Sequence, residues 1–233
     1  MAVSSWSHSK YTDFAKCKRM FFLKHDQKIP EPERELRPGQ TEHANDRGSR
    51  IHDSLEVYVR GLGDFPNEAR EFRSEFDHMR HLFDQGRVSL EGEWGMDRNW
   101  DIAPWKSAWL RLKLDALVHA NKEEAVVIDY KSGRRFGNEM KHGEQTQLYA
   151  LNTFLRFPEL EVVHTELWYL DVKELDHRVF TRDQALRFKR AWNNRGVEIT
   201  SAQAFPPNAN IYSCQYCGYG PWGTGDCPDG VKK

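Results

Sequence analysis

Residues 124–133 read EAVVIDYKSG, a short apolar run that leads into two charged side chains and a glycine. Val and Ile are enriched in strands, and successive side chains of a strand point to opposite faces of its sheet. Asp129 and Lys131 therefore share one face, with Tyr130 between them. The stretch predicts a strand over 124–131 that presents a carboxylate and an ammonium group side by side.

On either side of this strand, apolar residues recur with periods that distinguish strands from helices. Alternation predicts further strands over residues 88–96, 109–118 and 162–170. Helical spacing predicts helices over residues 6–25, 42–60, 67–85, 137–157 and 182–195. Prolines indicate a linker over 28–40, and the sequence from 205 is rich in Pro, Gly and Cys. We expect one α/β (α+β) domain over 1–233, with a mixed central sheet flanked by helices. Its parts are a helical region 1–87, a catalytic core 88–200 and a cysteine-bearing tail 201–233.

Charge and composition exclude several classes of protein. The 34 Lys and Arg residues nearly balance the 35 Asp and Glu residues, so the 233-residue chain has a formal net charge of −1. Binding of a polyanion through bulk charge is therefore excluded. A hydrophobic content of 39% excludes a wholly disordered chain. No apolar run approaches the roughly 20 residues that cross a bilayer, and no signal peptide is evident, so we expect a cytoplasmic protein without a membrane partner.

A second acidic residue lies in the strand predicted before 124–131. There Arg111, Lys113 and Asp115 alternate with leucines and share a face. If the two strands pair in the matching register, Asp115 converges with Asp129 and Lys131. Such a cluster suits metal-assisted phosphodiester hydrolysis, because Mg2+ prefers carboxylate oxygens and a lysine can stabilise developing charge. Taken alone, the same residues are more typical of a solvated face with weak ion pairs.

Two further motifs carry polar side chains on predicted helices. Gly48 and His52 form G-x3-H, and Gln145 and Tyr149 form Q-x3-Y after the Asp-x-Lys strand. The i, i+4 spacing puts Gln145 and Tyr149 on one helix face. Each motif alone is more typical of a structural role, but their order along the chain is specific.

In this order, the motifs resemble those of the RecB-like branch of the PD-(D/E)XK nuclease superfamily. Members of this branch carry a G-x3-H histidine, an acid in an R-x3-D-like strand, a D-Y-K-(S/T)-G strand and a Q-x3-Y helix. The corresponding residues are Gly48 with His52, Arg111 with Asp115, Asp129 to Gly133, and Gln145 with Tyr149. The opening SWSHSKYTDFAKCKRMFFLK is also similar to a helix of the family that ends in a cysteine and aromatic residues.

The resemblance implies a restriction-endonuclease-like fold and a divalent-metal-dependent deoxyribonuclease. It further implies that this enzyme is an exonuclease on DNA ends or single strands, and that it acts in DNA recombination, repair or degradation in bacteria or phages. The implied ligands of Mg2+ or Mn2+ are His52, Asp115, Asp129 and the Tyr130 carbonyl. Lys131 would assist the attacking water, and Gln145 and Tyr149 would orient Lys131 or touch the substrate. The histidine ligand favours Mn2+ somewhat.

Other functions stay open at this point. The main alternative is a non-cleaving DNA-binding accessory protein stapled by a metal, and an RNA-directed nuclease could use the same residues. The chain has no G-x4-GK-(S/T) loop, so it cannot unwind DNA with ATP by itself. A recombination or helicase partner is therefore compatible with the sequence.

The cysteines suggest a second metal centre. Cys214, Cys217 and Cys227 read C-x2-C-x9-C, and Cys17 lies far upstream. Four thiolates suit zinc or an iron-sulfur cluster, which would tie the tail to the first helix, whereas a packing role is the simpler reading of Cys17. In AddB-type nucleases and the nucleases of CRISPR adaptation, which this arrangement resembles, one plus three cysteines carry a four-iron cluster (4Fe-4S). The gap before Cys227 is longer here, so zinc stays the alternative.

Cations near the catalytic strand are candidates for DNA binding. They are Arg111, Lys113, Arg134, Arg135 and Lys141, with Arg182, Arg187, Lys189, Arg190 and Arg195 on the late helix. Lys and Arg contacts to phosphates position a strand without reading its sequence. Trp6, Tyr11, Trp168 and Trp192 could stack on bases, although each alone is more typical of a core.

Overall fold

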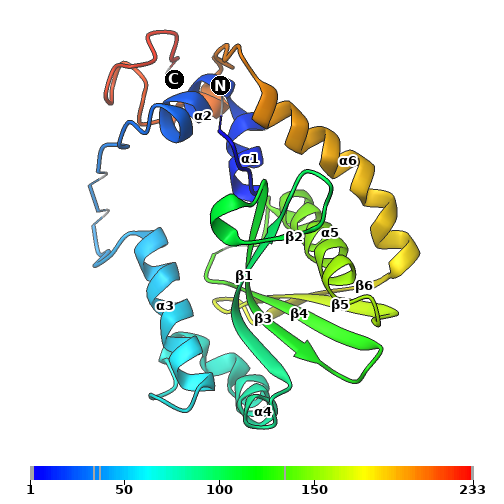
Figure 1. The fold of residues 1–233 in the computed structure, drawn as a ribbon. Coiled ribbons are helices and arrows are strands. Elements are labelled where there is room, and N and C mark those ends of the chain that lie inside the picture. Colours follow the sequence, from blue (N-terminus) through cyan, green and yellow to red (C-terminus); the bar gives the residue numbers. More distant parts are fainter. Residues whose placement is uncertain (1–2, 34, 37, 134, 232–233) are drawn as a thin grey trace.

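The computed structural model describes residues 3–33, 35–36, 38–133 and 135–231, and its centre is a six-stranded sheet (Figure 1). The strands lie in the order β2-β1-β3-β4-β5-β6. Their bounds are β1 (Val88–Met96), β2 (Ile102–Ala103), β3 (Leu110–His119), β4 (Glu124–Lys131), β5 (Val162–Tyr169) and β6 (Glu174–Thr181). Neighbouring strands pair antiparallel, except that β4 and β5 are parallel. This sheet confirms the mixed central sheet expected from the sequence.

The strand β4 is central, and its two faces belong to two hydrophobic cores. Val127 packs in one core, whereas Ile128 and Tyr130 pack in the other. Parallel strands need a crossover connection, which here contains α5 (Glu139–Arg156). The chain therefore passes directly from the charged end of β4 into α5, and this brings two of the predicted motifs together.

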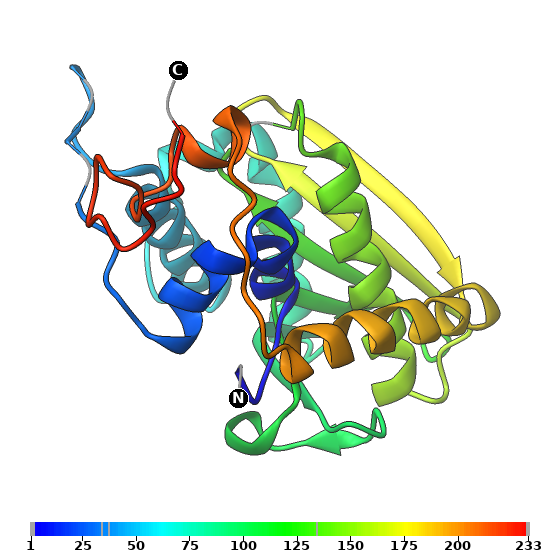
Figure 2. The same ribbon diagram turned by 90° about the horizontal axis from the view of Figure 1, so that it is seen from above.

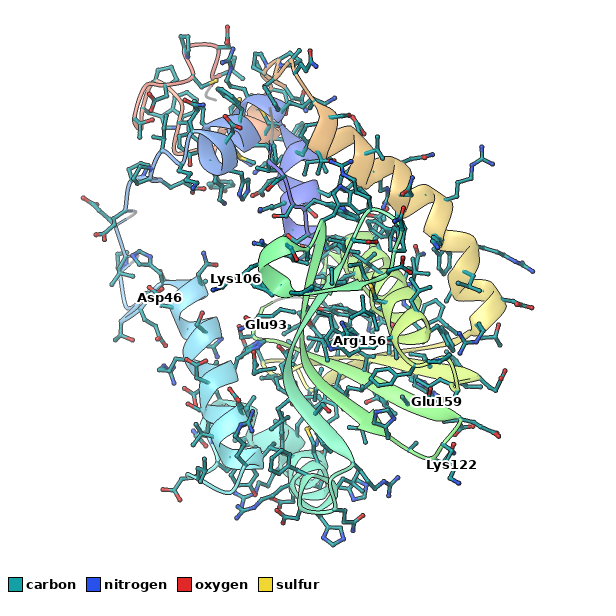
Figure 3. The ribbon with its side chains drawn as sticks, viewed as in Figure 1. Asp46, Glu93, Lys106, Lys122, Arg156 and Glu159 are labelled. Carbon is teal, nitrogen blue, oxygen red and sulfur yellow. The ribbon has the colours of Figure 1, made fainter. Side chains whose placement is uncertain are left out.

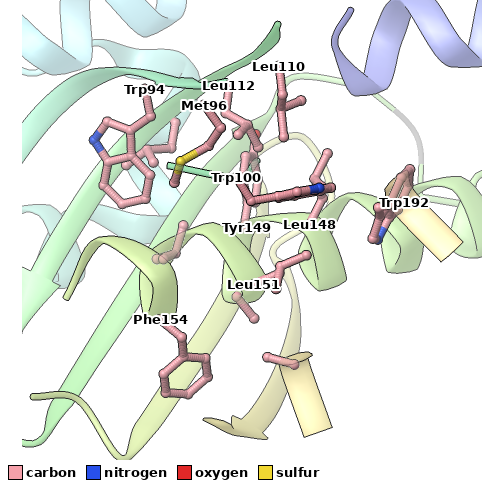
Figure 4. Close-up of a cluster of buried hydrophobic side chains, with 14 of the residues drawn as sticks. Trp94, Met96, Trp100, Leu110, Leu112, Leu148, Tyr149, Leu151, Phe154 and Trp192 are labelled. Carbon is pink, nitrogen blue, oxygen red and sulfur yellow. The ribbon is translucent and has the colours of Figure 1, made fainter. Parts of the chain in front are cut away.

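Helices cover both faces of the sheet (Figures 1 and 2). One face is covered by α5, α6 (Arg182–Ser201) and α1 (His8–Lys16), around the aromatic-rich core that Figure 4 shows in part. The other face is covered by α3 (Ala44–Val59), a 3-10 turn (Asn67–Phe72) and α4 (Arg73–Asp84). Apolar stripes on these helices supply the cores, which explains the helical spacing seen in the sequence.

The helix expected over 6–25 is wrong as a single element. It is broken at Cys17, whose backbone is extended with φ −162° and ψ 113°. Beyond the break lie α2 (Lys18–Phe21) and a π-helical turn (Phe22–Asp26). The sequence has no glycine or proline at this point, so no local signal marks the break. Packing of Cys17 against the C-terminal tail accompanies it.

Four further elements differ from expectation. The strand β6 has no clear apolar alternation because it is an edge strand on which Phe180 is the buried side chain. The helix α6 continues past 195 to Ser201, and a capping box of Thr181 and Gln184 begins it. The tail contains a short helix, α7 (Ile211–Cys214), and a 3-10 turn (Trp105–Ser107) lies between β2 and β3. Within the described ranges, no helix combines the length and the apolar character needed to span a membrane.

Candidate active site

The Asp-x-Lys pair lies at the end of β4, on the face that α5 covers. The Lys131 ammonium forms an ion pair with Asp129 and donates a hydrogen bond of 3.0 Å to Gln145 Oε1. Asp129 is only 5% exposed, so little water screens its carboxylate. Strand alternation therefore brings the acid and the lysine together as the sequence predicts.

Two side chains of α5 complete this network. The Gln145 amide donates to the Tyr149 hydroxyl at 2.7 Å and to Asp129 Oδ1 at 3.3 Å. The Tyr149 hydroxyl lies 2.7 Å from Asp129 Oδ1 and 2.9 Å from the Lys113 carbonyl oxygen, so its single proton has two acceptors in reach. Burial, and then the Asp129 charge, raises the pKa of Tyr149 well above its usual value. Tyr149 therefore stays a hydrogen-bond donor at working pH.

Asp115 lies where β3 and β4 separate. The described pairing of these strands ends at Ala116 and Ile128, and beyond that point Asp115 Oδ2 accepts the backbone N–H of Tyr130 at 2.5 Å. Asp115 Oδ1 lies 3.0 Å from His52 Nδ1, which α3 supplies. The side chain thus takes the place of a ladder hydrogen bond and links β4 to α3.

The electrostatics of this pair favour a bound cation. Burial raises the pKa of the Asp115 carboxyl, and the nearby Asp129 charge raises it further, despite the hydrogen bond with His52. Burial alone would lower the pKa of His52, but the hydrogen bond and charge of Asp115 outweigh burial and raise it. Two buried carboxylates repel one another, and a cation between them would relieve that repulsion.

Glu91 is a site residue that sequence reasoning missed. It lies on β1 between Leu90 and Gly92, in the register position opposite Asp115, and has a positive φ of 49°. Ligand atoms of Glu91, His52 and Asp115 lie within 4.8 Å of one another. Glu91 also forms an ion pair of 3.2 Å with Lys113. One glutamate in an alternating strand carries no signal in the sequence, because its inward position depends on the local backbone twist.

The donor set fits a hard divalent cation. Carboxylates of Asp115 and Glu91 with the imidazole of His52 offer oxygen and nitrogen ligands that suit Mg2+ or Mn2+. Asp129 lies close enough to influence the pKa of both His52 and Asp115, but its carboxylate is hydrogen-bonded to Tyr149 and paired with Lys131. Metal binding by Asp129 and the Tyr130 carbonyl therefore stays a prediction.

A cleft of about 510 Å³ opens beside the Asp129 network. Its lining includes the cations Lys10, Arg111, Lys113, Lys131 and Lys141. Of the described residues that line it, Asp129 alone is acidic. The near-neutral chain thus concentrates positive charge at one concave surface, as a phosphate-bearing ligand requires.

The predicted DNA-binding cations divide into two groups. Arg111 stacks over Trp105, and Arg111, Lys113 and Lys141 all line the cleft. Arg135 lies outside its lining and forms an ion pair of 3.1 Å with Glu174. Arg134 lies outside the described residues.

On α6, two of the predicted contacts have structural partners instead. Arg182 donates to backbone carbonyls at the end of α5, including that of Phe154 at 2.9 Å, and thereby satisfies a helix terminus. Arg195 is paired with Glu144 at 2.6 Å. The prediction that tryptophans stack on bases is also wrong, because the three predicted tryptophans are at most 5% exposed. They are Trp6, Trp168 and Trp192.

All four cysteines line one small pocket between the end of α1 and the tail. Cys17, Cys214 and Cys227 are buried, and Cys217 is half-buried. The Asn208 backbone N–H donates to Cys17 Sγ at 3.4 Å. Among the described side chains, no three cysteine sulfurs lie within 4.8 Å of one another. The end of α1 and the tail therefore meet at the cysteines, but no three of the described sulfurs form a compact group.

The fold and the site together define a class of protein, the restriction-endonuclease-like nucleases. The core of this class is a mixed α+β sheet that presents an Asp-x-Lys strand, a second carboxylate and a Q-x3-Y helix. The family comparison agrees. The model of the PD-(D/E)XK nuclease superfamily matches residues 5–115 and 107–222. The chain belongs to the PD-(D/E)XK nuclease superfamily.

Solved structures provide distant matches. SSO0001 is 14% identical, with 100% of this chain and 89% of that chain covered and a TM-score of 0.49. An alkaline exonuclease from Laribacter hongkongensis is 11% identical, with coverage of 86% and 90% and a TM-score of 0.34. A phage-related exonuclease from Haemophilus somnus 129PT is 9% identical, with coverage of 86% and 94% and a TM-score of 0.31. No curated protein matches the sequence.

Proposed function

We propose that this chain is a Mg2+- or Mn2+-dependent deoxyribonuclease that acts as an exonuclease on DNA ends or single strands. The observation that carries the proposal is the continuous network of Lys131, Asp129, Gln145 and Tyr149 beside the His52–Asp115 pair. Superfamily membership supports hydrolysis of phosphodiesters, and the cationic cleft supports a nucleic-acid substrate.

Each side chain has a distinct part in the proposed reaction. A divalent cation bound by His52 and Asp115, with Glu91 or Asp129, would supply Lewis-acid polarisation and a bound water of lowered pKa. Lys131, held by Asp129 and Gln145, would place its ammonium beside the attacked phosphate and stabilise the charge that develops there. Gln145 and Tyr149 are positioning residues that fix Lys131 and Asp129.

The test is cleavage of DNA labelled at either end, single- and double-stranded, with Mg2+ and Mn2+ varied and each end blocked in turn. We expect Asp115→Ala and Lys131→Ala to abolish cleavage. The control is Lys122→Ala, in the exposed β3–β4 turn. Lys122 lies at the opposite end of the sheet from Lys106, which directly follows the cleft residue Trp105 (Figure 3). Cleavage unchanged in both site variants would refute the proposal, and cleavage of matched RNA but not DNA would reassign the substrate.

For the cysteine pocket, we propose a four-iron cluster, with structural zinc as the alternative. All four cysteines line one pocket, and the backbone N–H directed at Cys17 Sγ supports a metal-bound thiolate there. The choice of a four-iron cluster over zinc rests on the resemblance of the one-plus-three cysteine arrangement. Purification without oxygen, followed by visible absorption and metal analysis, tests this. A colourless protein with stoichiometric zinc would refute the cluster, and no metal at all would refute both.

A further inference from the structure

The first turn of α1 forms part of the wall of the cleft, together with residues of β4 and α5. Ser7, His8, Ser9 and Lys10 all line it, together with Lys131, Gln145 and Tyr149. The helix α1 has nine residues and begins at His8, with Ser7 as its N-cap. The similarity of residues 5–24 to a helix of the family assigns no role to these side chains.

The N-terminus of α1 offers free hydrogen-bond donors. The Ser7 hydroxyl accepts the Lys10 backbone N–H, which satisfies one donor of the first turn. Among the residues that the structure describes, no acceptor lies opposite the backbone N–H groups of His8 and Ser9. Unsatisfied N–H groups and the helix dipole together favour an anion at this position.

The His8 side chain is an independent indication of a ligand. It is only 8% exposed, lines the cleft and packs edge-on against Trp192. Its Nε2 is buried and has no hydrogen-bond partner among the described residues. Leaving a buried polar atom unpaired is unfavourable, so such atoms usually have a partner in the functional state.

The surroundings select an anion as that partner. Burial, and then the charges of Lys141 and Lys131, lowers the pKa of His8 to about 4, so the imidazole is neutral and can donate one N–H. Lys10 and Arg111 line the same cleft. The Lys10 ammonium is held at 3.2 Å from the Ser5 carbonyl oxygen, which fixes it beside the first turn.

We propose that the first turn of α1, with His8 Nε2 and the Lys10 ammonium, binds a phosphate group of the nucleic-acid strand other than the one being cleaved. This inference rests on the proposed function only in that the substrate is a nucleic-acid strand. The ligand is either a terminal phosphate or an internal phosphodiester, which have the same chemistry. Neutral donors next to the cations Lys10 and Arg111 suit phosphate, which accepts several hydrogen bonds at once.

The test measures binding of single-stranded oligonucleotides in EDTA, so that cleavage does not interfere. Lys10→Gln should weaken binding about 5- to 10-fold and reduce the slope of log K against log salt by about 0.7, the value for one phosphate contact on a single strand. His8→Leu should weaken binding by a similar factor without changing that slope, because His8 is neutral. The matched control is Lys16→Gln, an exposed lysine in the last turn of the same helix.

The source of the phosphate is distinguished by substrate. Oligonucleotides with a 5′-phosphate, a 3′-phosphate or no terminal phosphate are compared with one that carries an internal methylphosphonate. A variant effect that disappears without the terminal phosphate identifies an end-binding site, and one lost only with the methylphosphonate identifies an internal contact.

Two results separate the inference from the proposed function. If the wild-type protein cleaves DNA but Lys10→Gln and His8→Leu bind every oligonucleotide as Lys16→Gln does, the phosphate site is refuted and the nuclease stands. If wild-type protein cleaves nothing while both variants lose affinity as described, the phosphate site stands and the nuclease assignment fails. Circular dichroism confirms that His8→Leu is folded, and Lys10→Gln decides alone if it is not.

Discussion

Replacing Tyr149 by Phe removes one buried oxygen from the centre of the catalytic network and leaves the ring in place. That oxygen lies 2.7 Å from Asp129 Oδ1, and it accepts the Gln145 amide at 2.7 Å. The carboxylate keeps its ion pair with Lys131 and its contact of 3.3 Å with Gln145. The substitution therefore removes the charge-assisted hydrogen bond to Asp129 and, with it, the acceptor of the Gln145 amide.

Its magnitude follows from the burial of the pair. A hydrogen bond to a charged group contributes about 1.5–3 kcal/mol, so we expect Tyr149→Phe to lower the free energy of unfolding by about 2 kcal/mol. In a protein of this size that corresponds to a decrease in Tm of roughly 4–8 °C. Loss of a similar free energy in the transition state would reduce kcat about 10- to 100-fold. The KM for DNA should change little, because the hydroxyl is bonded within the protein.

The assays are urea unfolding without metal and cleavage of labelled DNA with Mn2+. Tyr212→Phe is the control, because the Tyr212 side chain is 79% exposed and outside the cleft. An unfolding free energy within 0.5 kcal/mol of wild type, a margin typical of surface substitutions, would refute the hydrogen bond. A stability loss of the expected size with unchanged kcat would refute the positioning role of Tyr149.

Three further predictions concern the surrounding structure. Between pH 6.5 and 4, His8 binds a proton in the unfolded chain but not in the folded one, so the free energy of unfolding falls as the pH falls. Measured by urea unfolding, this free energy should fall by roughly 2 kcal/mol more in wild-type protein than in His8→Gln between pH 7 and 5. Glu91→Gln should weaken Mn2+ binding about tenfold in calorimetry, or about 1.4 kcal/mol, with exposed Glu93→Gln unchanged; equal affinities would exclude Glu91 as a ligand. Gly196→Ala should lower the free energy of unfolding by about 1–3 kcal/mol, because the added Cβ would meet Trp6 Nε1 at 2.5 Å. Alanine is the better helix former, so a rise in Tm would contradict the proposed clash.

The part of the site that could be predicted is the part that is local in sequence. Alternation was enough to pair Asp129 with Lys131 on one strand, and i, i+4 spacing was enough to pair Gln145 with Tyr149 on the helix that follows. That the two pairs meet was implied by the family resemblance. The mixed sheet was predictable for the same reason, since β4, α5 and β5 are consecutive elements with clear periods.

The parts that could not be predicted depend on long-range packing. Glu91 faces Asp115 because of a positive φ in β1, and His8 enters the cleft because α1 packs near α5 and α6. The break at Cys17 has no glycine or proline to mark it. The strand β6 pairs with β5 through its backbone while most of its side chains face solvent, so its composition looks like that of a loop.

The shortness of α1 has a mechanical consequence. Cys17 ends this helix in the cysteine pocket, and Ser7 to Lys10 begin it in the cleft. Nine residues at 1.5 Å each make a rod of about 14 Å, which is too short to bend appreciably. A metal group bound by the cysteines, as proposed above, would therefore hold one end of α1, and the other end of α1 lies in the cleft. We expect removal of that group to weaken binding of the proposed nucleic-acid strand while the residues around Lys131 stay in place.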